Sequence, residues 1–186
     1  MLAFLKDRMN DYTVVSFINE LCEASKYLGV LEAKINSYHF EKILIPLLRK
    51  KEAISSMQIE GTQTTMSDVF EEEIKAQSTA DKAAIEVQNH TKALIMGVEH
   101  LKNNDFSHDF IKELHRIMLT GVISPKLQDS LGKYKTKDNK IVNRAKTVIF
   151  TPPSYTQTEE YMDELIAYMN KEDDANPLVK AAIIHS

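Results

Sequence analysis

The chain has 186 residues, 43% of them apolar, which is enough to bury one core, and its net charge is −4. No basic stripe runs along it, which argues against nucleic-acid binding through this portion. The apolar runs are far shorter than the roughly 20 residues of a membrane span, and the N-terminal charges do not fit a signal peptide. Cys22 is alone, so no disulfide framework is expected. We expect a cytoplasmic protein without a membrane segment.

Helical periodicity dominates the first part of the chain. Residues 16–29 predict a helix that ends at Gly29, because glycine just after a periodic run is a common helix end. Residues 39–61 are helical on both sides of Pro46, and we interpret them as two elements because proline disrupts a helix interior. The second of these elements, about 52–61, ends at Gly61.

Three further helices are predicted before the pattern changes. They cover residues 65–77, 79–104 and a stretch that starts after Ser107, a favourable N-cap residue. Residues 132–153 then alternate and contain several β-formers, which predicts a β-hairpin with its turn at 137–140.

The last part of the chain returns to helical spacing. Residues 154–174 predict one helix, and Pro177 fits the first turn of another. That last helix is apolar and reaches Ser186 without a cap, so we expect that the chain is cut in mid-helix.

Glu60 is difficult to explain by folding alone. It lies in the last turn of its predicted helix, where a carboxylate is unfavourable by about 0.3–1 kcal/mol. Ser56 is four residues earlier on the same face, within hydrogen-bonding reach, and Gly61 follows. The alternative is an incidental acid at a surface helix end.

The hairpin also has two interpretations. It can be a surface decoration, although an isolated hairpin is only marginally stable unless it is packed or used. An exposed strand edge can instead bind an extended peptide as an added strand. The six histidines follow no recognised metal-ligand pattern, and no glycine-rich phosphate loop is present, so the residues by themselves predict no catalytic set and no metal site.

The segments together resemble the Fic family, enzymes that transfer AMP from ATP to protein hydroxyls. Residues 56–61 fit the family's inhibitory pattern [ST]-x-x-x-E-[GN]. The family's order is followed by "RKKEAISSMQIEGTQTTMSDV", "EVQNHTKAL", "IKELHRIML", "LGKYK", "FTPPSY" and "NPLVKAAIIHS". Lys135 departs from the family, which usually has arginine in G-x-Y-R. The defining motif H-x-F-x-[DE]-G-N-G-R would begin a few residues after His185 and is absent, so we expect these 186 residues alone to be inactive.

The resemblance implies a role for each region. Glu60 would pair with an arginine of the absent motif and so deny that arginine to the γ-phosphate of ATP, with Ser56 bracing Glu60 and Gly61 freeing the backbone. Residues 134–151 would form a flap that aligns the target, through Tyr134, Lys135, Val148, Ile149, Phe150 and Thr151.

The expected fold is mostly α, a helical bundle with one β-hairpin that is cut before its last core helices. Residues 1–78 would be the N-terminal region and 79–186 the first part of the Fic core. The resemblance implies ATP and Mg²⁺ as cofactors and, as partner, a protein with a Ser, Thr or Tyr hydroxyl, the protein itself included, while a homo-oligomer stays open. The alternatives are a transferase of another nucleotide or phosphate group, and a non-catalytic binding or inhibitory module.

Overall fold

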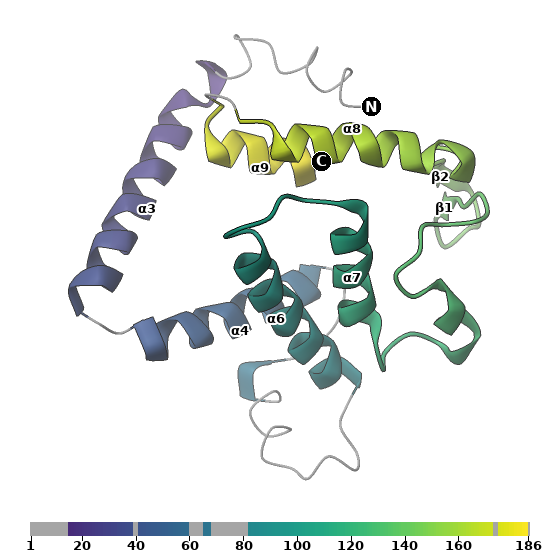
Figure 1. Ribbon diagram of the computed structural model, residues 1–186, viewed down its shortest axis with the longest axis horizontal. Helices are drawn as coiled ribbons and strands as arrows, with labels where there is room; N and C mark the ends of the chain where they lie inside the picture. The colour runs from purple at the N-terminus through teal and green to yellow at the C-terminus, as the bar shows by residue number, and fades with distance from the viewer. Residues whose placement is uncertain (1–14, 39–40, 60–64, 68–81, 173–174, 186) are drawn as a thin grey trace. The chain divides into compact units, whose positions relative to one another are not determined.

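The computed structural model describes residues 15–38, 41–59, 65–67, 82–172 and 175–185. It is mostly helical with one two-stranded antiparallel hairpin, which confirms the predicted fold class (Figure 1). In these residues, no helix is both long and apolar enough to cross a membrane. The chain divides into two compact units, residues 1–51 with 171–186, and residues 52–170. The predicted boundary between 78 and 79 stays a prediction.

The first unit contains α3 (Ile18–Tyr38), the start of α4 (Glu41–Ile59) and α9 (Pro177–His185). The prediction that a helix ends at Gly29 is wrong, because α3 continues through this residue. Gly29 lies in open space inside a helix, where it costs up to about 1 kcal/mol relative to alanine and does not stop the helix-forming residues that follow. Pro177 begins α9 as predicted, and the side chain of Asn176 accepts a hydrogen bond from the N–H of Leu178.

The prediction of two elements around Pro46 is also wrong, because α4 is one helix with this proline inside it. Pro46 lies in the second turn and has no N–H to donate to the carbonyl of Lys42. The eighteen other residues of α4 keep the helical conformation, and its C-terminal part is anchored in the core of the second unit. One lost hydrogen bond near the helix start therefore does not break the helix.

The second unit is built around a small apolar core between α4 and α6 (Lys82–His100). Ala53 is 0% exposed and Ile54 6%, and both pack with Val87 of α6. Met57 and Met66 cover this cluster from the side. Burial of these side chains fixes the face that α4 turns toward α6, and with it the position of the end of α4.

The helix α7 (His108–Leu119) packs beside α6, and the two helices are joined by a short loop (Figure 1). Ser107 is the N-cap as predicted, and its hydroxyl accepts from the N–H of Phe110 at 3.2 Å. The rings of Phe110 and His100 stack with centroids 3.9 Å apart. Asn89 of α6 donates its amide to the carbonyls of Met118 and Thr120, at 3.1 and 2.7 Å, and so satisfies acceptors at the end of α7.

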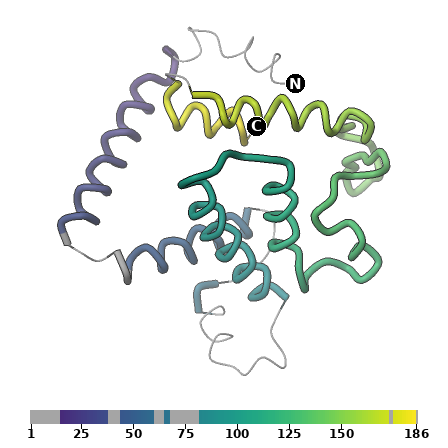
Figure 2. The backbone as a smooth tube through the Cα atoms, in the orientation of Figure 1, coloured from purple at the N-terminus to yellow at the C-terminus, as the bar shows by residue number. Residues whose placement is uncertain are grey.

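The chain then runs through a short 3₁₀ helix, η2 (Pro125–Ser130), into the hairpin, a path that Figure 2 traces. The hairpin strands are β1 (Ile141–Val142) and β2 (Val148–Phe150). The register pairs Ile141 with Phe150 and Val142 with Val148, so Ile149 is the extra residue of a bulge.

The turn of the hairpin is at 143–147, and the predicted turn at 137–140 is wrong. The side chain of Asn143 accepts from the N–H of Thr147 at 3.0 Å, and its main-chain oxygen accepts from the N–H of Lys146 at 2.9 Å. Lys146 adopts a φ of 61°, in the left-handed region that closes the loop. In the segment before β1 the acceptor side chains are bonded elsewhere, Asp138 to Ser154 and Tyr155 and Asn139 to Lys135.

After the hairpin, the 3₁₀ helix η3 (Tyr155–Gln157) leads directly into α8 (Thr158–Asn170). Asn170 holds the end of α8 against the loop before α7. Its side-chain oxygen accepts from the N–H of Phe106 and its amide donates to the carbonyl of the same residue, both at 2.8 Å.

Candidate functional site

The first predicted site residue, Ser56, lies on α4 beside the core, and its side chain bonds to a residue one turn earlier in the same helix. Its Oγ donates to Oε1 of Glu52 at 3.0 Å, one turn earlier. Glu60 and Gly61 lie outside the described residues, so their predicted roles stay predictions. Glu52 was not among the predicted site residues, although it lies four residues from Ser56, as Glu60 does.

His90 of α6 lies close to Glu52. Its Nδ1 is buried and lies 3.7 Å from Oε2 of Glu52, and it has no hydrogen-bond partner among the described residues. Glu52 therefore links Ser56 on α4 to a histidine on the neighbouring helix.

The hairpin presents apolar side chains to solvent. Ile149 is 62% exposed, and its neighbours Val148 and Phe150 are exposed as well. Thr151 follows directly after β2 and is also exposed. Among the described residues β2 pairs only with β1, so main-chain groups at the outer edge of β2 have no partner strand there and could pair with another strand.

The base of the hairpin is held by polar bonds. The ammonium group of Lys135 donates to Oδ1 of Asn139 at 2.9 Å and to the carbonyl of Pro153 at 2.5 Å. Lys135 therefore joins the segment before β1 to the segment after β2. An ammonium group can make both bonds as a point charge, without the planar fork of an arginine.

Asp138 makes the second connection across the hairpin base. Its Oδ1 accepts from the hydroxyl of Ser154 and from the N–H of Tyr155, both at 2.9 Å. The bond from the Tyr155 N–H, with that from Ser154 and the charges of Lys135 and Lys140, holds the pKa of the Asp138 carboxyl below its ordinary value. The predicted turn residues are thus part of the anchor of the hairpin.

Tyr134 belongs to a chain of hydrogen bonds that joins three elements. Its hydroxyl lies 2.7 Å from Nδ1 of His108, and Nε2 of His108 lies 2.7 Å from Oδ1 of Asp163 on α8. A neutral imidazole satisfies both contacts when Tyr134 donates to Nδ1 and Nε2–H donates to Asp163. Burial, followed by the nearby charges of Glu159, Asp163 and Asp109, raises the pKa of Tyr134 and keeps its hydroxyl protonated.

Gly132 allows this segment to pass close to α7. Its φ is +67°, and a Cβ at this position would lie 2.7 Å from Nη2 of Arg116 and 3.0 Å from the carbonyl oxygen of Lys112. Its N–H donates to Nδ1 of His115 at 3.0 Å. Glycine at 132 is therefore required by both the backbone conformation and the space.

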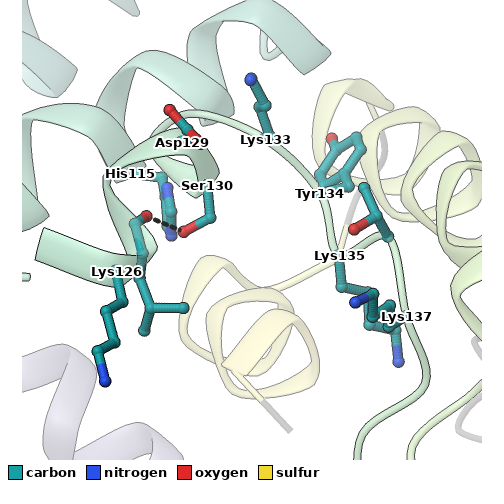
Figure 3. A pocket seen from close by; sticks show the side chains of 10 residues that line it. His115, Lys126, Asp129, Ser130, Lys133, Tyr134, Lys135 and Lys137 are labelled. Atoms are coloured by element: carbon teal, nitrogen blue, oxygen red, sulfur yellow. Dashed lines mark hydrogen bonds between the residues drawn. The ribbon is translucent and has the colours of Figure 1, made fainter. Parts of the chain in front are cut away.

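A cavity of about 650 Å³ opens beside this segment (Figure 3). It is lined by residues of α7, η2 and the segment before β1. Its charged side chains and its histidine are His115, Lys126, Asp129, Lys133, Lys135 and Lys137.

The described residues contain no group of three or more His, Cys, Asp or Glu side chains that could hold a metal ion. They do bring together Tyr134 and Lys135, two of the predicted flap residues, at the base of the hairpin. His108, Asp138 and Asp163 could not be found from sequence spacing, since their partners are 26, 17 and 55 residues away.

Comparison of the sequence with models of protein families identifies the family of this chain. A model of the Fic/DOC family N-terminal region matches residues 18–99, and a model of the Fic/DOC family matches residues 105–186. The chain belongs to the Fic/DOC family. Members of this family generally modify other proteins after translation, for example by AMPylation. No curated protein matches the chain.

Proposed function

We propose that the protein transfers AMP from Mg²⁺-bound ATP to a Ser, Thr or Tyr hydroxyl of a protein, itself included, and that Glu60 restrains this transfer. The family match along both regions supports the reaction class. The observation that carries the proposal is the inhibitory pattern Ser56-x-x-x-Glu60-Gly61 at the end of α4, a helix whose preceding turns are fixed in the core.

The restraint is electrostatic. A carboxylate that pairs with a guanidinium group makes a strong, directional bond, and that guanidinium is then not available to a phosphate of ATP. The catalytic motif that would supply the arginine is not among the 186 residues. The role of this chain is to position the carboxylate.

The hydrogen bond that Ser56 makes limits how this residue can support Glu60. A hydroxyl has one proton, and in the structure Ser56 donates it to Glu52. Bracing Glu60 would therefore require the hydroxyl to turn from Glu52 to Glu60. We propose that the two glutamates compete for Ser56.

The hairpin would align the target protein. Its apolar strands are exposed and its outer edge has no partner strand in the described part of the chain, whereas its base is held by Lys135, Asp138 and the Tyr134–His108 contact. A firm base with an open edge suits the addition of an extended target segment as a third strand.

The test uses a form of the protein that includes the catalytic motif. The initial rate of AMP incorporation from labelled ATP is measured at saturating ATP for wild type, Glu60→Gly and Glu60→Ala. Both variants should be faster by about tenfold or more, because a hydrogen bond to a charged group contributes about 1.5–3 kcal/mol. Glu32→Ala, which removes an exposed acid from α3, is the matched control and should leave the rate unchanged.

Rates at or below wild type in both Glu60 variants would refute the restraint. Labelling with another nucleotide but not with ATP would favour a different transferred group. No labelling under any condition, with a folded protein, would favour a binding or inhibitory module.

A further inference from the structure

The lysine-lined cavity beside the hairpin is not used by the proposed transfer or by its restraint. Four lysines line it, and Asp129 is the one acidic residue in the lining. This local excess of positive charge contrasts with the net charge of −4 of the whole chain. The cavity therefore attracts anions, although the net negative charge of the whole molecule repels them.

Three of the four lysines have ammonium groups that are available to a ligand. Lys135 is committed to the hairpin base through Asn139 and Pro153. In the described part of the chain, Lys126, Lys133 and Lys137 form no ion pair. In Figure 3 the side chains of these three residues lie around the hollow and point in different directions.

This arrangement favours several separated negative charges over one compact phosphate group. Phosphate sites usually offer main-chain N–H groups that converge on one point. Here the N–H groups of Leu127, Leu131, Gly132 and Lys133 already donate to acceptors within the protein. The positive charges of the cavity are carried by flexible ammonium groups, which act as separate point charges.

The position of the cavity indicates what such an anion is attached to. Residues 133–137 line the cavity and continue without a break into β1. The segment is fixed to the hairpin base by Lys135, and Tyr134 ties it to α7 and α8. A ligand bound in the cavity is therefore held next to the base of the hairpin to which the target protein would dock.

We propose that this cavity binds an acidic, extended segment of the protein that is modified, whose carboxylates pair with Lys126, Lys133 and Lys137. The identification of the partner as the modification target rests on the proposed function; the binding does not. The cavity would thus favour targets that have acidic residues close to the modified hydroxyl. Because the pairs are exposed, binding is modest and sensitive to salt.

The test measures binding without any transfer reaction, so its failure and the failure of the proposed function can be told apart. A fluorescent oligo-glutamate peptide is titrated with the 186-residue chain, and anisotropy reports binding. The triple variant Lys126→Gln, Lys133→Gln, Lys137→Gln should bind about tenfold more weakly, since each exposed ion pair strengthens binding by about twofold. Binding should also weaken as salt rises from about 0.1 M to about 1 M, because the screening length falls from about 10 Å to about 3 Å.

The matched control is the triple variant Lys34→Gln, Lys51→Gln, Lys92→Gln, which changes the net charge equally at exposed positions outside the cavity. It should bind the peptide as wild type does. Equal weakening in both triple variants would overturn the proposal, because the whole surface and not the cavity would then attract the peptide. Tighter binding of inorganic tripolyphosphate or of oligo-uridylate than of oligo-glutamate, with loss in the cavity variant, would also overturn it in favour of a phosphate ligand or RNA.

Discussion

In the proposed function the end of α4 restrains the transfer and the hairpin binds the target, and the structure holds these two regions in different ways. The α4 segment is fixed by burial, with Ala53 and Ile54 packed on Val87. The hairpin has exposed apolar strands and is fixed by hydrogen bonds at its base. Apolar burial is worth more than exposed polar bonds, so the position of α4 is coupled to the stability of the whole unit, whereas the hairpin can be loosened locally.

This contrast makes sense for the proposed function. A restraint must hold its carboxylate in one place, which a packed core does well. A hairpin that accepts different target segments must keep an edge open, and an open edge cannot be buried. The predictions below test this difference, beginning with the largest effect.

Shortening a core side chain of α4 should reduce the stability of the whole second unit. Ile54→Ala removes buried methyl groups beside Val87, and the free energy of unfolding should fall by about 2–4 kcal/mol. Ile59→Ala in the same helix is the matched control; Ile59 is 85% exposed, and its loss should change stability by less than about 0.5 kcal/mol. Urea denaturation followed by circular dichroism measures both. Equal effects of the two substitutions would mean that α4 is not held by this core.

Proline in β2 should affect target modification far more than stability. Ile149 is the bulge residue, and Ile149→Pro removes an N–H that a docked target strand would use. Loss of that hydrogen bond should lower the rate of target labelling by about tenfold. Ile149→Ala keeps the N–H and should retain more of the rate, so the pair separates main-chain pairing from side-chain contact. Unchanged labelling in the proline variant, with the fold intact, would rule out strand addition at this residue.

Removing the imidazole bridge should loosen the hairpin base without unfolding α4. His108→Ala breaks the contacts to Tyr134 and Asp163, which should lower stability by about 1 kcal/mol. Amide hydrogen exchange should become faster in residues 132–140 and stay unchanged in α4. Tyr134→Phe, which removes only the hydroxyl, should show part of the effect. Faster exchange throughout the second unit would contradict the view that the hairpin base is a separate, locally held region.

The two regions also differ in how far the sequence predicts them. The cap at Ser107, the start of α9 at Pro177 and the presence of a hairpin all follow from short-range chemistry, and each is confirmed. The helix through Pro46 was missed because core packing offsets one lost hydrogen bond. The turn was misplaced because Asn143 and Lys146 form it without glycine, and the spacing of the lysine-rich segment gave no sign that Asp138 has a partner after β2.

The smallest predicted effect concerns charge at the hairpin base. The pKa of Asp138 is lowered in the folded protein, so the group binds a proton less readily there than in the unfolded chain. Its stabilising contribution is therefore fully present above the unfolded pKa of about 4 and is lost as the pH falls through the lower folded value. Asp138→Asn keeps an acceptor for Ser154 and Tyr155 but has no charge at any pH.

The melting temperature of Asp138→Asn should accordingly be below that of wild type at neutral pH, and the difference should shrink toward zero as the pH falls below about 4. Asp129→Asn removes a carboxylate that makes no hydrogen bond or ion pair in the described part of the chain, and it controls for the loss of surface charge in the same unit. Because Asp138 is exposed, the difference should be smaller than that for His108→Ala. A difference that stays constant through the acid range would show that the two hydrogen bonds, and not the carboxylate charge, hold the hairpin to the residues before α8.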